Sequence, residues 1–469
     1  MRRVARRSCG LHGASFSGCG ASCAAKRFGA CAVKFKPMTI TTSRVERVLW
    51  IACPTLMFGV MFGHMNGVVN TTLALIGVGT LAGILSASRP PFRQWPLVLP
   101  IVVWAAWSLA SVGWSLYPRI SLRAWFDEVL YPLVTFWGFW LFGSRVKRPE
   151  WPVLVVWAAC VLLALLSAFY WGHLQPPTPN TFPIRFYNRV GHTSTLVVFA
   201  MPLFATLLLR ARWRAIGAVG LVACGFVGLA SLNRFFWPAA GATLVVAFYP
   251  LYRRRLGVSI VAIAILGATA LGLLEYSARE RDLSASTATA SASSAARDIT
   301  VAGQRVYVPG ELNALGDTLS SDTRPKLWAF YTEQGKQHAW LGVGFGKPLP
   351  GHAYAADAPP LLLQIEPQAL THAHNLFLNT WLQTGYIGVA LEALLLVSLA
   401  AAFWRLRRDV PAVSAAGLAL VVGMIAKNTV DDFMWQTTML AFWSFAGFLL
   451  GCGERDACMA RVSQNADAR

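Results

Sequence analysis

Residues 192–232 read HTSTLVVFAMPLFATLLLRARWRAIGAVGLVACGFVGLASL, and this stretch decides the class of the fold. Two apolar runs, 192–210 and 213–232, meet at three closely spaced arginines, Arg210, Arg212 and Arg214. A helix needs about 20 apolar residues to cross the hydrocarbon core of a bilayer. The stretch therefore predicts two neighbouring membrane spans joined by a short basic loop.

The same alternation continues through most of the chain and predicts about twelve spans. They are expected near 46–64, 67–87, 95–115, 125–144, 151–171, 192–210, 213–232, 235–251, 257–275, 384–404, 411–430 and 435–452. An even number of spans places both termini on one side of the membrane. Basic residues mark alternate gaps, at Arg89 and Arg93, Arg145 to Arg148, Arg210 to Arg214, Arg253 to Arg255 and Arg405 to Arg408. Loops rich in Lys and Arg stay in the cytoplasm, so this side is predicted to be cytoplasmic.

Composition agrees with an all-α polytopic membrane protein. The 469 residues are 55% hydrophobic and 13% charged, whereas soluble domains carry about 25% charged residues. The formal net charge of +20 raises the question of nucleic-acid binding. The positive charge lies in short loops and in the N-terminal tail, so no nucleic-acid partner is expected, and membrane lipids are the predicted surroundings.

The chain divides into five predicted parts. Residues 1–37 are basic and contain no acid, and they are interpreted either as a disordered cytoplasmic tail or as a non-native extension, with Met38 as the start. The other parts are 38–275 with spans one to nine, 276–383 as an outer loop domain with short helices, 384–452 with spans ten to twelve, and 453–469 as a cytoplasmic tail.

The long outer loop is predicted to be partly folded. It opens with a low-complexity stretch from Ser284 to Ala296, which is typical of a flexible linker. A helix is expected after a cap at Ser321 or Asp322, with Pro325 in its first turn and Gly335 at its end.

The apolar face of this helix is expected to contain Leu327, Phe330 and Tyr331. A second, amphipathic helix is predicted from Thr371 to Gly385, leading into the tenth span. The run LGVGFG at Leu341 to Gly346 lacks the context of a phosphate-binding or dinucleotide-binding loop, so it is predicted to be a turn.

Three arginines on the outer side are candidates for anion binding. Arg234 lies between two apolar spans with almost no loop, where burying a charge costs about 2.5–3.5 kcal/mol on insertion scales. Arg324 lies in the first turn of the predicted loop helix, where helix N–H groups also favour anions. Arg189 precedes the sixth span. The alternative for each is snorkelling at the interface or pairing with a carboxylate.

Two histidines are candidates for proton transfer. His372 and His374 lie at the predicted outer edge of the membrane, and an imidazole that titrates near neutral pH can accept a proton from a hydroxyl. A zinc site needs three or four ligands, and His352 is the single further histidine nearby in sequence. The alternative is that both are hydrogen-bonded interfacial histidines.

Further ionisable residues are predicted at membrane depth, where they usually pair or serve function. They are Asp127, Glu128, Glu392, Lys427, Asp431 and Asp432. Lys427 and Asp431 lie one helical turn apart and are expected to form an ion pair.

Three sequence elements together resemble the O-antigen ligase family, within the larger O-antigen ligase and polymerase superfamily. The first is the turn Ser231 to Trp237. The second is Arg324 and Trp328, which lead to the LGVG segment within Trp340 to Gly346. The third is the H-x-H-N-x-x-L…G-x-x-G run from His372 to Gly388. The resemblance covers roughly residues 180–400. In the family the first element usually reads Ser-Arg-Gly, and here it reads Asn-Arg-Phe, which leaves the local backbone geometry open.

The resemblance implies a bacterial enzyme of the inner membrane with its active site facing the periplasm. Such ligases are similar to membrane glycosyltransferases of the GT-C class. They transfer a glycan from undecaprenyl diphosphate to a sugar hydroxyl of the lipid A–core oligosaccharide, and they use no metal, nucleotide sugar or other cofactor.

Applied to this chain, the resemblance implies roles for particular residues. Arg234 and Arg324, with Arg189 as a further candidate, are expected to bind the diphosphate leaving group in place of a metal ion. His374 is expected to be the general base, with His372 in reserve. Asn375 and Asp432 are additional candidates for substrate contact, and direct attack predicts inversion at the anomeric carbon.

Three other functions remain open at the level of sequence. An O-antigen polymerase would use the same donor with a growing glycan as acceptor. A protein O-oligosaccharyltransferase would use a Ser or Thr acceptor. A transporter of lipid-linked sugars would have no need for a base at His374.

Overall fold

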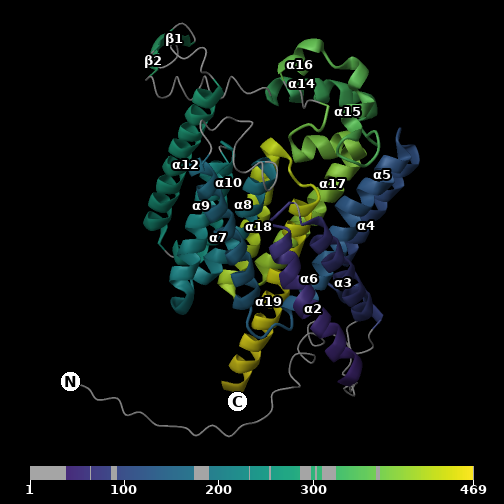
Figure 1. Cartoon of the computed structure of the whole chain (residues 1–469), viewed down its shortest axis with the longest axis vertical. Helices are drawn as coiled ribbons and strands as arrows, with labels where there is room; N and C mark the ends of the chain where they lie inside the picture. Colours follow the sequence, from purple (N-terminus) through teal and green to yellow (C-terminus); the bar gives the residue numbers. More distant parts are fainter. Residues whose placement is uncertain are drawn as a thin grey trace, which may run out of the picture.

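The computed structural model describes residues 39–63, 65–85, 92–173, 190–231, 233–252, 255–285, 297–301, 304–308, 324–365 and 370–467. Helices dominate this part of the chain (Figure 1). Those before the long outer loop are α2 Thr39–Gly59, α3 Asn66–Leu85, α4 Val98–Ala110, α5 Pro118–Trp125, α6 Tyr131–Gly143, α7 Glu150–His173, α8 Val190–Leu208, α9 Arg214–Ala230, α10 Phe236–Ala247, α11 Tyr249–Tyr252 and α12 Leu256–Ala285. The later ones are α14 Arg324–Gly335, α15 Leu349–Ala353, α16 Pro360–Ile365, α17 Leu376–Arg405, α18 Pro411–Asp431 and α19 Thr437–Asp467.

The membrane-protein class is confirmed in its general form. Each of the twelve predicted apolar segments coincides with a helix or, for 125–144, with the π-helical turn Phe126–Leu130 followed by α6. Among the described residues, six helices are long and apolar enough to cross a membrane, and four more apolar helices are shorter. A short helix such as α10, at about 1.5 Å per residue, does not reach across a 30 Å hydrocarbon core by itself. The count of twelve crossings therefore stays a prediction.

The packing of α19 against α6 shows how small residues bring the spans together. A Cβ atom added to Gly447 would lie 2.2 Å from the carbonyl oxygen of Phe136, so no larger residue fits there. Because lipid tails are as apolar as leucine, close backbone approach of this kind is a main source of helix association in membranes.

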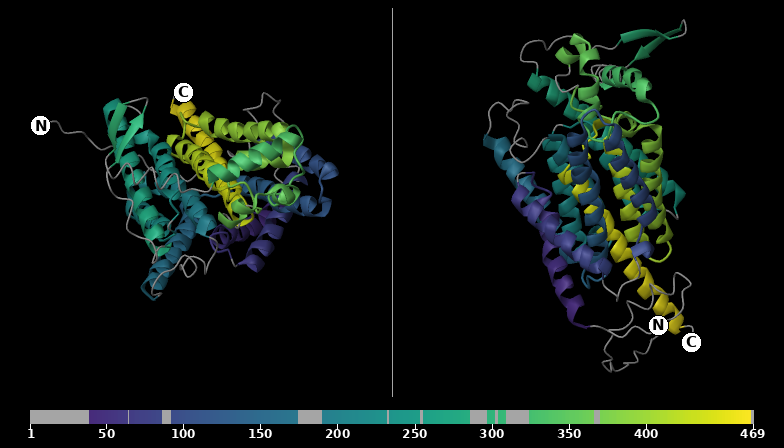
Figure 2. Two further views of the ribbon diagram at one scale, coloured as in Figure 1. Left: turned by 90° about the horizontal axis from the view of Figure 1, so that it is seen from above. Right: turned by 90° about the vertical axis from the view of Figure 1, so that its right-hand side faces the viewer.

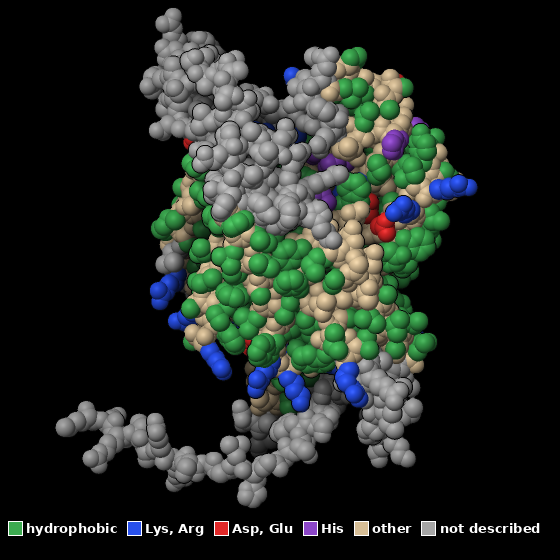
Figure 3. Space-filling view, viewed as in Figure 1, with side chains coloured by type: hydrophobic (Ala, Val, Ile, Leu, Met, Phe, Trp, Pro, Cys, Tyr) green, Lys and Arg blue, Asp and Glu red, His purple; other side chains and the backbone are tan. Residues whose placement is uncertain are grey.

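The two ends of the helical bundle differ in charge and in structure. The helices α14, α15 and α16 cap one end, and the C-terminal part of α19 extends from the other (Figures 1 and 2). Lys and Arg side chains gather along the end from which α19 extends (Figure 3). The helices of the long loop and the gathered Lys and Arg side chains thus lie at opposite ends of the bundle, as the positions of the basic loops in the sequence predict.

The capping helices share a small hydrophobic cluster with the start of α17, separate from the main core of the bundle. Leu327 and Tyr331 of α14 are fully buried in it, and Phe330 is partly buried against it. The predicted helix with Pro325 in its first turn and Gly335 at its end is thus confirmed as α14, Arg324–Gly335. The predicted caps Ser321 and Asp322 lie outside the described residues.

Two elements in the loop region depart from the sequence-based expectation. A hairpin of β1, Arg297–Val301, and β2, Gln304–Val308, pairs antiparallel with Arg297 opposite Val308. Its β-branched and aromatic residues favour strands, a signal too short to stand out beside the apolar helical runs. In addition, α12 continues to Ala285, ten residues past the predicted end of its span, so it includes the first two residues of the predicted linker.

A break in α17 positions the residues above the bundle. Gly385 has φ 69° and ψ −171°, which interrupts the helix. The carbonyl groups of Leu382 and Gln383 lose their helical partners there and instead accept hydrogen bonds from Val343 N–H and Gly344 N–H, each at 2.9 Å. The LGVGFG run is therefore a turn, as predicted, and its physical task is to complete the hydrogen bonding of the broken helix.

Candidate active site

The two histidines lie in a turn that immediately precedes α17. The helix predicted from Thr371 begins only at Leu376, because Asn375 has an extended backbone and caps the helix, its Oδ1 accepting from Leu378 N–H at 3.0 Å. His374 has φ 50°, in the left-handed region. The imidazole rings of His372 and His374 lie 4.0 Å apart between centroids. The turn thus presents two adjacent imidazoles at the end of the bundle that α14, α15 and α16 cap.

Helix α14 is fixed directly to this turn. Trp328 Nε1–H donates a hydrogen bond to the carbonyl oxygen of Ala373, between the two histidines, at 2.9 Å. Arg324 lies one helical turn before Trp328 on the same helix. The second and third sequence elements, which are distant in the chain, are therefore held together by a specific bond.

Arg234 belongs to the short connection between α9 and α10. Its guanidinium carbon lies 5.0 Å from the ring centroid of Phe235, and that of Arg324 lies 4.5 Å from the same centroid. Both distances are within the range of a cation–π interaction. The first sequence element thus meets the second at one aromatic ring.

Asp431, at the C-terminal end of α18, joins these parts. Its carboxylate forms ion pairs with Arg324 and with Lys427, and it accepts a hydrogen bond from Asn233 Nδ2 at 3.0 Å. The predicted pair between Lys427 and Asp431 is confirmed. Two cations share this one buried carboxylate, which makes the surroundings favourable for a further anion.

The ring of Phe433 connects the histidine turn with this charged group. His372 lies 6.1 Å from it between ring centroids, and Lys427 Nζ lies 5.2 Å from its centroid. His372 is buried, and its Nδ1 lies 2.9 Å from the Thr371 hydroxyl. The imidazoles therefore stand beside the cluster of cations.

Burial lowers the pKa of His372 well below its ordinary value. The neighbouring His374 and Lys347 lower this pKa further, and Asp431 opposes them. His372 is therefore neutral at pH 7, with a ring nitrogen that accepts a proton only when the solution becomes acidic.

The depressed pKa of His372 predicts acid sensitivity. In the unfolded chain this imidazole has a pKa of about 6.5, so below that pH the unfolded state binds more protons than the folded state, and stability falls. Above that pH the imidazole is neutral in both states, so its titration causes no loss of stability there. We expect the melting temperature of the wild type to drop more between pH 7.5 and pH 5.5 than that of His372→Gln in the same detergent. Parallel decreases in the two proteins would contradict a depressed pKa.

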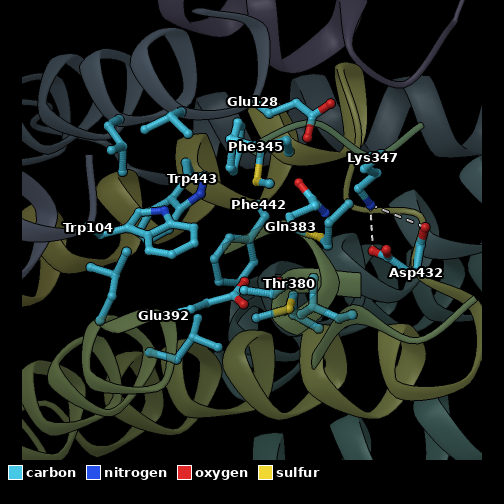
Figure 4. A pocket seen from close by; sticks show the side chains of 18 residues that line it. Trp104, Glu128, Phe345, Lys347, Thr380, Gln383, Glu392, Asp432, Phe442 and Trp443 are labelled. Atoms are coloured by element: carbon cyan, nitrogen blue, oxygen red, sulfur yellow. Dashed lines mark hydrogen bonds and ion pairs between the residues drawn. The ribbon is translucent and has the colours of Figure 1, made fainter. Parts of the chain in front are cut away.

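A largely apolar cavity with a few charged and polar side chains lies beside α17, which contributes residues from Leu376 to Leu396 to its lining (Figure 4). Its volume, measured as the space open to the centre of a water-sized molecule, is about 50 Å³. Glu128 and Glu392 enter it from opposite walls, and the aromatic rings of Trp104, Trp443 and Phe442 are among its apolar lining. These acids, which the sequence placed at membrane depth, face an internal cavity rather than lipid.

The buried ion pair of Lys347 and Asp432 lies at one side of the cavity (Figure 4). Lys347 Nζ also donates to the Asp432 carbonyl at 3.3 Å. The second carboxylate oxygen of Asp432, Oδ2, is buried and has no hydrogen-bond partner among the residues that the structure describes. The pair ties the glycine-rich turn to the end of α18.

Breaking this pair on one side should destabilise the protein strongly. Lys347→Met leaves the Asp432 carboxylate buried without compensation, and a loss of about 3–5 kcal/mol in the free energy of unfolding is expected. The double variant Lys347→Met with Asp432→Asn should recover much of that loss because no charge remains buried. Thermal unfolding in detergent measures both; a double variant no more stable than Lys347→Met would argue against an electrostatic origin.

The predicted site residues fall into three groups. Arg234, Arg324, His372 and His374 come together, whereas Arg189 lies outside the described residues. Asn375 has a structural task as a helix cap, and Asp432 is engaged with Lys347.

Sequence interpretation did not single out Lys347, and it recognised Asp431 only as a charge at membrane depth and the partner of Lys427. The position of Lys347 directly after the glycine-rich run is the signal in the sequence that could have drawn attention to it.

Comparison with known families agrees with this geometry. A sequence model of the O-antigen ligase family matches residues 197–393. The chain carries an O-antigen ligase family domain. The predicted family is confirmed, and its members are glycosyltransferase-like enzymes, ligases and polymerases, that act on lipid-linked glycans. No curated protein matches the chain in a sequence comparison.

The matched range of this O-antigen ligase family domain contains four of the predicted site residues, namely Arg234, Arg324, His372 and His374. Asp431, Lys427 and Asp432 lie beyond its end, on α18 and just after it. The carboxylate that orients Arg324 is therefore contributed by a part of the chain that the family match does not include.

Proposed function

We propose that this protein is an O-antigen ligase of lipopolysaccharide biosynthesis. It transfers a glycan from undecaprenyl diphosphate to the lipid A–core oligosaccharide on the periplasmic face of the bacterial inner membrane. The observation that carries this proposal is that the guanidinium groups of Arg234 and Arg324 meet at the ring of Phe235, beside the turn with His372 and His374.

The proposed topology has twelve crossings with both termini in the cytoplasm and a GT-C-like arrangement. Two observations support it: every predicted span coincides with a helix, and Lys and Arg side chains gather along the end of the bundle opposite α14–α16. The histidine turn and Arg324 then face the periplasm, on the side where α14, α15 and α16 cap the bundle.

The chemical step is a direct displacement at the anomeric carbon of the donor. The acceptor hydroxyl oxygen attacks this carbon, the bond to the diphosphate oxygen breaks, and its electron pair stays on the diphosphate. The configuration of the anomeric carbon is inverted. The hydroxyl proton passes to the imidazole of His374, the proposed general base.

The arginines stabilise the charge that grows on the leaving group. A guanidinium offers a planar fork of donors that matches two phosphate oxygens, and it stays charged at every physiological pH. Asp431 and Phe235 hold Arg324 from two directions, so the donors are oriented before the reaction starts. Preorganised donors of this kind contribute most to stabilising a transition state. These groups make a metal ion unnecessary in the proposed mechanism.

Two buried carboxylates are further candidates for contacts that orient the substrate. Asp432 Oδ2 and Glu392 Oε2 are buried without hydrogen-bond partners among the described residues, and both belong to the lining of the cavity. We place the polar end of a substrate near this cavity mouth, with Asp432 as a candidate contact for a sugar hydroxyl. The apolar spans receive the isoprenoid tail and the acyl chains of lipid A.

The deciding experiment is transfer in vitro with purified protein and a lipid-linked glycan. Three acceptors are compared: lipid A–core, the free repeat-unit glycan on its lipid, and a Ser/Thr-containing peptide. Ligation to lipid A–core is expected, and it should continue in EDTA. Elongation of the lipid-linked glycan would identify a polymerase, a glycosylated peptide would identify a protein oligosaccharyltransferase, and loss of activity in EDTA restored by a divalent ion would overturn the metal-free mechanism.

A further inference from the structure

The side chain of Phe235 is in contact with both arginines of the proposed diphosphate site. Its ring centroid lies 5.0 Å from the guanidinium carbon of Arg234 and 4.5 Å from that of Arg324. The two arginines come from segments 90 residues apart in the sequence, so the ring is a point at which they meet. The negative face of an aromatic ring attracts cations within about 6 Å of its centroid.

The backbone of Phe235 is anchored by contacts that do not involve the arginines. The Phe235 N–H donates to Asn233 Oδ1 at 3.1 Å, and the next N–H, of Phe236, donates to the Asn233 carbonyl at 2.9 Å. Phe236 is fully buried against Gly228, where a Cβ atom would lie 2.0 Å from the Phe236 ring. The backbone that carries Phe235 is therefore fixed before any ligand binds.

The same anchor reaches Arg324 by a second route. Asn233 Nδ2 donates to Asp431 at 3.0 Å, and Asp431 forms the ion pair with Arg324. The guanidinium of Arg324 is thus held by the Asp431 carboxylate through one of its nitrogens, and it lies over the ring of Phe235. A group held by two partners has less freedom to rotate than one held by a single partner.

We propose that Phe235 is a positioning residue that sets the spacing and orientation of the two guanidinium groups toward the diphosphate. It acts through Arg234 and Arg324, and it does not touch the reacting atoms. This inference rests on the proposed function of the arginines. The alternative is that Phe235 is an ordinary apolar residue at this end of the bundle. In that case the shape of its side chain matters for activity, and the electrons of its ring do not.

Simple substitutions separate these two roles. Phe235→Leu keeps an apolar side chain and removes the ring, and we expect kcat/KM for the lipid-linked donor to fall about tenfold, the scale of losing two cation–π contacts. Phe235→Tyr and Phe235→Trp keep an electron-rich ring and should stay within about threefold of the wild type. The KM for the acceptor should change little in all three variants.

Fluorinated phenylalanines at position 235 provide the sharper test because they withdraw ring electrons with little change in shape. Activity with the donor should decrease in steps as one, two and three fluorines are added. The same series at Phe330, whose ring lies against Tyr331 on α14 at 5.1 Å, is the matched control and should show no graded decrease. A flat response at Phe235, or equal activity in Phe235→Leu, would overturn the proposal.

The outcome can be distinguished from failure of the proposed function itself. If Arg324→Ala abolishes transfer while the Phe235 series is flat, the diphosphate site stands and the positioning role is lost. If Arg324→Ala transfers glycan at the full rate, the assignment of the arginines fails, and a graded effect at Phe235 is not expected.

Discussion

Replacement of His374 by alanine should lower the rate of glycan transfer about 10²–10⁴-fold at neutral pH, the range that a positioned general base contributes. The loss should appear in kcat. The KM for the lipid-linked donor should change little, because Arg234 and Arg324 remain in place. A radiolabelled or fluorescent donor glycan, with purified protein in detergent or nanodiscs, measures both quantities.

The backbone of the histidine turn explains why His374 is the first choice. A residue with φ 50° that is not glycine costs on the order of 1–3 kcal/mol, and such conformations persist where the surroundings enforce them. Here the bond from Trp328 to the Ala373 carbonyl and the cap formed by Asn375 hold the turn from both sides. His374 is therefore presented in one orientation, with His372 buried behind it.

Two variants make the His374 result interpretable. His372→Gln keeps a hydrogen-bonding side chain beside Thr371, and we expect a smaller loss of activity than in His374→Ala. His352→Ala alters an exposed histidine whose ring packs 5.7 Å from that of Tyr117, and it should be nearly silent. Unchanged transfer in His374→Ala would remove the base assignment. A loss confined to the His372 variant would move that role to His372.

The general architecture was predictable because it depends on signals that are repeated many times. Apolar runs of about 20 residues, separated by clusters of Arg and Lys, predict helices and sidedness with little help from tertiary structure. The loop helix α14 was also predictable, since Pro325 and Gly335 mark its two ends and Leu327 and Tyr331 its buried face. These are local properties of sequence.

The parts that could not be predicted depend on contacts between distant segments. The meeting of Arg234 and Arg324 at Phe235 joins residues that share no local pattern. The sequence departs from the usual family residue at position 235, and this position proved to carry the contact. The pair between Lys347 and Asp432 likewise crosses 85 residues of chain, so no helical spacing announces it. The helix start at Leu376 was missed because the residues before it are compatible with an amphipathic helix.

Arg324→Ala should reduce transfer at least about 10²-fold, the cost of removing one preorganised donor from a site where negative charge develops. We expect the loss of transfer activity to be larger for Arg324 than for Arg234, because Arg324 is held by both Asp431 and Phe235. Arg324→Lys should restore activity only in part. An ammonium group keeps the charge near Asp431, but it offers no planar fork to two phosphate oxygens and stacks less well on an aromatic ring.

The comparison between the alanine and lysine variants separates charge from geometry. Removing Arg324 leaves Lys427 as a cation on Asp431, so the buried carboxylate stays compensated and the fold should survive the change. Melting temperature and retention on a size-exclusion column confirm this before activity is measured. Arg407→Ala is the matched control, because the guanidinium carbon of Arg407 also lies over an aromatic ring, 4.5 Å from the centroid of Trp404, but Arg407 belongs to the connection between α17 and α18, far in sequence from the histidine turn. It should transfer glycan at nearly the wild-type rate.

Each result for Arg324 has a distinct meaning for the mechanism. Low activity in the alanine variant with partial recovery in lysine indicates that both charge and orientation act on the leaving diphosphate. Full activity in Arg324→Lys would show that a point charge suffices, and the argument for paired donors to the phosphate oxygens would fail. Full activity in Arg324→Ala would remove this arginine from the chemistry, and its bond to Asp431 would then serve only to fix α14 on the end of α18.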